Sequence, residues 1–265
     1  MDKKITIKDI ARQAGVSVAT VSYVINNRTD QRISEKTRKK VLQIVNLLDY
    51  EPNSSAKSLS TSKTYNIALY MMPEISLLKR SEQLQLIEVL SDVLIHYGYH
   101  LIIQDCKDTT KINYVDAILC FEATVEFFLS ISDKNLIPVI AIDCMVNVPW
   151  FFQICNDYNK LKQKADEHFG NDHYTYVCLP PNNELLKSFI SKTFSKIRFV
   201  QDLNDFSYIP DQHYVYNQKA LDYLLAGKEN TRYISTDMHA KMQKVFECIE
   251  LAVNRVPDME HIQFV

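Results

Sequence analysis

The chain has 265 residues, of which 46% are hydrophobic, enough for one large globular domain or two modest ones with real cores. Its four glycines lie far apart, so no glycine-rich loop can surround a phosphate, which excludes P-loop and dinucleotide-fingerprint enzymes. The six cysteines form no CxxC pair and have no metal-ligand spacing, which argues against zinc and against a disulfide framework. A reducing, cytoplasmic setting is expected.

The net charge of −2 conceals a division of charge along the chain. Residues 1–63 contain 12 Lys and Arg against 6 Asp and Glu, whereas the other 202 residues contain 18 against 26. This split favours a small basic module that binds a polyanion, joined to a larger acidic body. A solvated basic face without a partner is the alternative. The N-terminus lacks the apolar core of a signal peptide, and no segment is suited to cross a membrane.

Residues 6–26 predict a helix, a tight turn and a second helix. Thr6 is a suitable N-cap for a helix with apolar residues at Ile7, Ile10, Ala11 and Ala14. Gly15 can end that helix with a positive φ, and Ser17 can cap the next. The second helix has an inward stripe of Val21, Val24 and Ile25. Its outer face, which could enter a DNA groove, carries Val18, Ala19, Ser22, Tyr23 and Asn26.

A third helix is predicted from Ser34 onward, with Val41, Ile44, Val45 and Leu48 at helical spacing. Its first two turns carry a group of cations, namely Lys36, Arg38, Lys39 and Lys40. Cations at this end oppose the helix dipole, so their placement makes most sense if they face an anion. Residues 53–63 are small and polar and are expected to form a linker that becomes helical on binding.

Five segments of this region closely resemble the headpiece of LacI-type bacterial transcriptional regulators. They are Ile5–Ser22 (ITIKDIARQAGVSVATVS), Val24–Asn26, Ile33–Arg38, Tyr50–Asn53 and Ala56–Leu59. The resemblance implies a homodimer that binds a pseudo-palindromic double-stranded DNA operator, and residues 1–63 would form the headpiece with its hinge. A sequence-specific regulator of this kind, most simply a repressor, is the function that we expect.

The resemblance also assigns DNA contacts to individual residues. Val18, Ala19, Ser22 and Tyr23 would face base edges in the major groove, while Ser17, Thr20 and Asn26 would hold phosphates. Ala56 and Leu59 would lie on a hinge helix, with Leu59 as a wedge in the minor groove. The expected set of contacts is completed by Thr6, Asn53 and Lys57. Tyr23 replaces the arginine usual in the family, so the operator sequence does not follow from the resemblance.

From Asn66 onward, apolar runs alternate with helical segments, which predicts an α/β body with parallel sheets. The expected strands are 67–72, 101–103, 117–121, 137–142, 151–155, 174–179, 197–200 and 233–236. The expected helices are 82–97, 161–168, 184–195, 218–226 and 240–253, the first with Leu84, Ile87, Leu90 and Leu94 inward. In the family, the body is similar to periplasmic sugar-binding proteins. Residues 64–157 would form its first lobe and residues 158–265 a second, shortened lobe.

The resemblance is weaker in the body, where Ile137–Asp143 looks like a family strand and Thr236–Ala240 like a family helix start. It implies that Lys162 and Asp237 face a cleft between the lobes. The alternatives are a solvated helix lysine and a helix N-cap. The implied effector is a sugar, sugar phosphate or nucleoside, whereas a body that only dimerises or binds a protein remains a second interpretation.

No cofactor is expected, and the sequence contains neither an HExxH pair nor a Gly-x-Ser-x-Gly elbow. The chain is therefore not expected to be an enzyme. Two rival hypotheses stay open at this point: an enzyme with a fused regulatory head, and an architectural protein that binds DNA without sequence preference.

Overall fold

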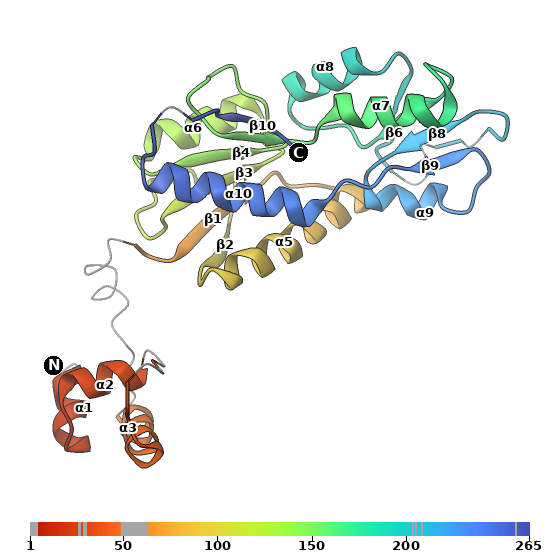
Figure 1. Cartoon of the computed structure of the whole chain (residues 1–265). Coiled ribbons are helices and arrows are strands. Elements are labelled where there is room, and N and C mark those ends of the chain that lie inside the picture. The colour runs from red at the N-terminus through yellow and green to blue at the C-terminus, as the bar shows by residue number, and fades with distance from the viewer. Residues whose placement is uncertain are drawn as a thin grey trace. The chain divides into compact units, whose positions relative to one another are not determined.

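The computed structural model describes residues 5–25, 28, 31–48, 63–202, 204, 206–207, 209–257 and 259–265. The chain divides into two compact units, Met1–Thr64 and Tyr65–Val265, called here the headpiece and the body (Figure 1). Within the described residues, no helix is both long and apolar enough to span a membrane.

The described residues of the headpiece form three helices, α1 (Ile7–Ala14), α2 (Val18–Ile25) and α3 (Glu35–Leu47). The ends of these helices confirm the predicted caps. Gly15 follows α1 with φ 67°, a left-handed conformation that glycine adopts without strain. The hydroxyl of Ser17 accepts the Thr20 amide at 3.0 Å, and that of Ser34 accepts the Thr37 amide at 3.2 Å.

A small apolar core holds the three helices together. Ile10 and Ala14 of α1, Val21 and Val24 of α2 and Val41 of α3 are all buried in it. The buried residues of α1 and of α2 lie at helical intervals, so one face of each of these two helices is covered.

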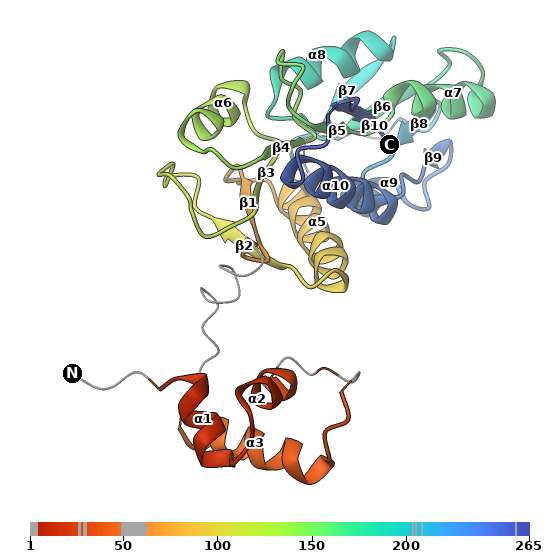
Figure 2. The same cartoon turned by 60° about the vertical axis from the view of Figure 1, so that its left-hand side comes forward.

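The body is built around two parallel sheets (Figure 2). The six-stranded sheet has the order β10-β5-β4-β3-β1-β2, and every pairing in it is parallel. Its strands are β1 (Asn66–Met71), β2 (His100–Gln104), β3 (Ala117–Phe121), β4 (Val139–Ile142), β5 (Gln153–Cys155) and β10 (Ile262–Phe264). The four-stranded sheet, also parallel, has the order β7-β6-β8-β9. Its strands are β6 (Thr175–Cys178), β7 (Ile197–Phe199), β8 (Tyr214–Tyr216) and β9 (Thr231–Tyr233).

Helices cover both faces of each sheet. Buried residues of α5 and α10 pack on one face of the six-stranded sheet and those of α6 on the other. On the four-stranded sheet, α7 and α8 pack on one face and the short pair η1–α9 on the other. The bounds are α5 (Leu77–His96), α6 (Val125–Lys134), α7 (Tyr158–Phe169), α8 (Glu184–Thr193), η1 (Lys219–Leu221), α9 (Asp222–Leu225) and α10 (Met238–Val253). We call the six-stranded layer system the first lobe and the four-stranded one the second lobe.

The predicted α/β class with parallel sheets is confirmed, and several details differ. The helix α6 and the short strands β8 and β10 were not predicted. The chain also returns to the first lobe at its end, because α10 packs on the first sheet and β10 pairs with β5. Residues 158–265 therefore do not form one continuous lobe.

The predicted inward stripe of the first body helix needs a correction at Leu84, which is 56% exposed. The buried residues of this helix are Leu78, Lys79, Leu86, Leu90, Val93 and Leu94, so the prediction is confirmed for Leu90 and Leu94. Leu84 lies two residues before Leu86, about 200° away around the helix, so both cannot face the sheet.

Candidate nucleic-acid interface and interlobe cleft

The outer face of α2 carries the side chains that the sequence predicts to read DNA. Val18 and Ala19, in the first turn of the helix, are exposed, while Ser22 and Tyr23 are half-buried one turn later. Val21 and Val24 point the other way into the headpiece core. The second helix of a helix-turn-helix places its N-terminal residues against base edges, so the exposed first turn of α2 has the geometry that this contact needs.

Three hydroxyls of the predicted DNA-contacting set have partners inside the headpiece. Ser17 Oγ lies 2.8 Å from Thr20 Oγ1, and together they close the start of α2. The Thr6 hydroxyl donates to an Asp9 carboxylate oxygen at 2.6 Å, and the Thr6 amide donates to the same oxygen at 3.1 Å. A hydroxyl that donates one hydrogen bond still has lone pairs that can accept another. These contacts therefore order the helix starts and leave the hydroxyl oxygens able to accept a further hydrogen bond.

Tyr23 has a cation beside it. The Arg28 guanidinium lies over the Tyr23 ring, 5.6 Å from its centroid. The Arg28 amide donates to the Tyr23 carbonyl at 2.9 Å, and Arg38 of α3 donates to the Arg28 carbonyl at 3.0 Å. These contacts fix Arg28 against the end of the outer face of α2, next to the position where the family resemblance expected an arginine.

Five predicted DNA-contacting residues lie outside the described residues. They are Asn26, Asn53, Ala56, Lys57 and Leu59. Their roles stay predictions.

A pocket lies between the two lobes of the body. Its lining comes from the carboxyl ends of strands in both sheets: Phe121 of β3 with Glu122, Asp143 after β4, Cys178 of β6 and Asn217 after β8. In open parallel sheets this edge is where ligands bind. Glu122 and Asp143 both adopt positive φ, 46° and 47°, so the backbone is strained at the two strand ends that face the pocket.

The floor of this pocket is an ion pair. Lys241 of α10 donates to both carboxylate oxygens of Asp143, at 2.7 and 2.6 Å, and to the Asn156 side chain at 3.0 Å. The Lys241 side chain is 3% exposed. Its charge is therefore compensated inside the protein rather than presented to a ligand.

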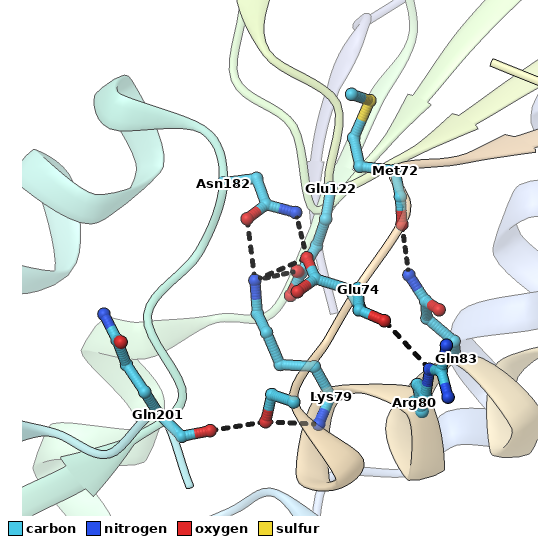
Figure 3. A network of polar contacts seen from close by, with 9 residues as sticks. Met72, Glu74, Lys79, Arg80, Gln83, Glu122, Asn182 and Gln201 are labelled. Atoms are coloured by element: carbon cyan, nitrogen blue, oxygen red, sulfur yellow. Dashed lines mark hydrogen bonds and ion pairs between the residues drawn. The ribbon is translucent and has the colours of Figure 1, made fainter. Parts of the chain in front are cut away.

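A second buried lysine lies in the first turn of α5 (Figure 3). Lys79 Nζ donates to Glu74 Oε1 at 3.0 Å and to Asn182 Oδ1 at 2.8 Å, and it lies 3.4 Å from Glu122 Oε2. Burial raises the pKa of Glu122 to about 7, against the opposing effect of the nearby Lys79 ammonium. Burial also raises the pKa of Glu82, which lines the same pocket.

Lys162 and Asp237, the two predicted cleft residues, are not among the residues that line the pocket. Lys162 Nζ bonds Asp166 at 2.9 Å and Asp172 at 3.2 Å on the surface of the second lobe. Asp237 accepts the Ala240 amide at 2.9 Å and caps α10. Both side chains are thus engaged by residues near them in the sequence, and their role in a ligand cleft stays a prediction.

Sequence reasoning missed the polar residues that do meet at the cleft, namely Lys79, Glu122, Asn182, Asn183 and Lys241. One signal was available: Asp143 directly follows the apolar strand 137–142, so the sequence placed a carboxylate at the edge of the sheet.

The free space in the pocket is small. The cavity measures about 50 Å³, which is room for a few water molecules and far below the roughly 300–1,000 Å³ of drug-sized ligand pockets. Among the described residues, no group of three His, Cys, Asp or Glu side chains is placed to hold a metal ion. A second pocket, of about 450 Å³, lies between the same two lobes and is lined by Glu74 and Lys79 on one side and by Pro181 and Asn182 on the other.

Part of the sequence is similar to proteins named catabolite control protein A. It is 40% identical over 147 residues to catabolite control protein A of Staphylococcus aureus, covering 51% of this chain and 43% of that protein. It is 36% identical over 119 residues to the protein of the same name from Streptococcus mutans, covering 44% of this chain and 34% of that protein. The matches thus span less than half of the length of these two relatives.

Solved structures share the fold of the whole chain. The lac repressor dimer bound to operator and the anti-inducer ONPF superposes with a TM-score of 0.63 at 15% identity, over 99% of this chain and 96% of that one. A complex of the transcriptional regulator CelR with cellobiose gives a TM-score of 0.50 at 14% identity, over 98% and 96%. Residues 6–53 match the family described as bacterial regulatory proteins, lacI family. The headpiece of this chain is thus similar to those of lacI-family regulators, and the chain as a whole shares the fold of the lac repressor.

Proposed function

We propose that the protein is a cytoplasmic, sequence-specific DNA-binding transcriptional regulator that acts as a homodimer on a pseudo-palindromic operator, and that it is not an enzyme. The observation that carries this proposal is the exposed first turn of α2, where Val18 and Ala19 lie outside the headpiece core. Small side chains at this place let the helix approach base edges closely. The regulatory relatives of the headpiece support the same function.

The charge of the headpiece supplies the sequence-independent part of binding. Residues 1–63 carry six more cationic than anionic side chains, and Arg38, Lys39 and Lys40 lie on α3. Each phosphate neutralised releases a counterion, so affinity should fall steeply with salt. Val18, Ala19, Ser22 and Tyr23 would then choose among sequences, while the cations set the overall affinity.

Selection from a random DNA library with the full-length protein tests this proposal. An enriched pseudo-palindrome with two half-sites is expected, together with one dimer per site by analytical ultracentrifugation. Enrichment without any palindrome, or none at all, would leave an architectural DNA-binding protein as the better account.

A matched pair of variants locates the reading face. Ala19→Glu places a carboxylate on the exposed turn of α2 and should abolish operator binding through repulsion from phosphates and unpaired base edges. Ala226→Glu makes the same change at an exposed position of the second lobe and should leave binding intact. Equal binding by the two variants would mean that α2 does not read DNA.

A further inference from the structure

An arginine beyond the end of α2 lies against the outer face of that helix. Tyr23 belongs to this face, because it follows Ala19 by four residues and so lies one turn further along the same side. Arg28 comes after the helix and is exposed. Its guanidinium carbon lies over the Tyr23 ring, 5.6 Å from the centroid, which is within the range of a cation–π contact.

Both backbone groups of Arg28 are bound inside the headpiece. Its amide donates to the Tyr23 carbonyl at 2.9 Å, a bond of the kind that closes the carboxyl end of a helix. Its carbonyl accepts a hydrogen bond from the Arg38 guanidinium of α3 at 3.0 Å. The main chain at Arg28 is therefore tied to α2 and to α3, so the starting point of its side chain is fixed relative to both helices.

The contact with Tyr23 leaves the Arg28 guanidinium able to bind an anion. A ring that contacts a guanidinium from above engages its face, whereas the five N–H donors of the group lie in its plane. In that plane, arginine binds phosphate oxygens through two parallel hydrogen bonds. A ring beneath the cation also limits its rotamers, so less side-chain entropy is lost when the anion binds.

The position of Arg28 along the chain favours a phosphate over a base as its ligand. In a helix-turn-helix, the N-terminal residues of the second helix reach the base edges. Arg28 lies three residues beyond Ile25, at the opposite end of α2. It also adjoins α3, where Arg38 contacts it and Lys39 and Lys40 are exposed. A row of cations beside the groove matches the sugar–phosphate backbone, which carries the negative charge of DNA.

We propose that Arg28 binds a DNA backbone phosphate beside α2 and that Tyr23 is its positioning residue, with the Tyr23 ring holding the guanidinium in place. This inference rests on the proposed DNA binding and extends it, because the family resemblance assigns no contact to Arg28. Tyr23 then has two separable parts, a hydroxyl that can reach a base edge and a ring that holds Arg28. The alternative is that Arg28 only compensates the dipole at the carboxyl end of α2, which needs no ring.

Titration of the full-length protein with a random-sequence duplex, at a series of salt concentrations, tests the pairing. Tyr23→Phe keeps the ring, whereas Tyr23→Leu and Tyr23→Met remove it and retain an apolar side chain that favours a helix. Each variant without the ring should bind this duplex about two- to fivefold more weakly for each headpiece in contact and, like Arg28→Ala, with a smaller salt slope. Tyr23→Phe should keep the wild-type affinity and slope. Combined with Arg28→Ala, Tyr23→Leu should cause no further loss.

Arg232→Ala, the same change at an exposed position of β9 in the second lobe, is the matched control and should bind as the wild type. Thermal melts followed by circular dichroism verify that each variant is folded at the temperature of the titration. The pairing is overturned if the variants without the ring bind random DNA as the wild type does, if Tyr23→Phe loses as much as Tyr23→Leu, or if the losses of Tyr23→Leu and Arg28→Ala multiply. In these three outcomes the wild type still binds DNA, whereas a wild type that binds no DNA would refute the proposed function itself.

Discussion

The carboxyl group of Glu122 should make the stability of the body fall as pH rises from about 4.5 to about 7. Its side chain is 15% exposed, between Lys79 and the strand end of β3, and its pKa is raised from 4.5 to about 7 mainly by burial. The folded protein therefore binds a proton that the unfolded chain has already lost between these two pH values. Stabilisation by this group is complete below about pH 4.5 and is lost as pH passes about 7.

The size of the effect follows from the two pKa values. A change from 4.5 to about 7 corresponds to about 3 kcal/mol of unfolding free energy. Glu122→Gln keeps the shape of the side chain and never ionises. We therefore expect the variant to gain about 3 kcal/mol relative to the wild type between about pH 4.5 and about pH 8, with most of the gain below pH 7.

Urea denaturation followed by circular dichroism, at a series of pH values, measures this difference. Subtracting the wild-type curve from the variant curve removes the titration of every other group that the substitution leaves unaltered. Glu88→Gln, at an exposed position in the middle of α5, is the control and should give a flat difference. A flat difference for Glu122→Gln as well would refute the reasoning, because it would mean that Glu122 stays ionised in the folded protein.

Four further predictions concern packing and DNA binding. Leu78→Ala should destabilise the body by about 2–5 kcal/mol, whereas Leu77→Ala, at a position that is 68% exposed, should change it little by the same denaturation assay. Gly15→Ala should lower the melting temperature of the headpiece, costing about 1 kcal/mol because alanine is strained at φ 67°; an unchanged melt would mean that the turn relaxes. Arg28→Ala should weaken operator and random DNA alike and reduce the salt slope by about one, whereas relaxed selection at one base pair would assign Arg28 a base contact instead. Leu59→Ala should weaken operator binding more than random binding, by a few kcal/mol in a band-shift titration, and equal losses would make Leu59 an ordinary linker residue.

The headpiece could be predicted closely from the sequence because its decisive contacts are local. The bonds of Thr6 with Asp9, Ser17 with Thr20 and Ser34 with Thr37 each join residues three positions apart. Such spacing can be seen directly in a sequence, and it indicates where each of the three helices starts. The predicted first helix and the Gly15 turn therefore agree with the structure residue by residue.

The cleft could not be predicted in the same way because its contacts are remote in sequence. Lys79 and Asn182 are 103 residues apart, Asp143 and Lys241 are 98 apart, and Glu82 and Ala220 are 138 apart. A single sequence does not show which polar residues, far apart along the chain, are in contact in the fold. Asp237 illustrates the limit, since its local signal indicated a helix cap and its remote role in a cleft came only from resemblance.

The strands that were missed or displaced have a related cause. β8 and β9 are only three residues long, and their bounds are set by pairing, with Tyr216 opposite Tyr233. The apolar run expected over 233–236 therefore ends its pairing at Tyr233, where β8 ends. Short strands in a parallel sheet carry little periodicity of their own, so their partners decide where they begin and end.

The regular apolar pattern of α5 predicts that the helix exists, but it does not predict that the helix packs against both lobes. Its later turns pack on the first sheet through Leu86, Leu90 and Leu94, while Leu78 in its first turn enters the core of the second lobe. Because α5 packs against both sheets, a movement of one lobe relative to the other would have to break some of these contacts. The length of α5 and the buried Lys79 beside Leu78 thus join the two lobes of the body.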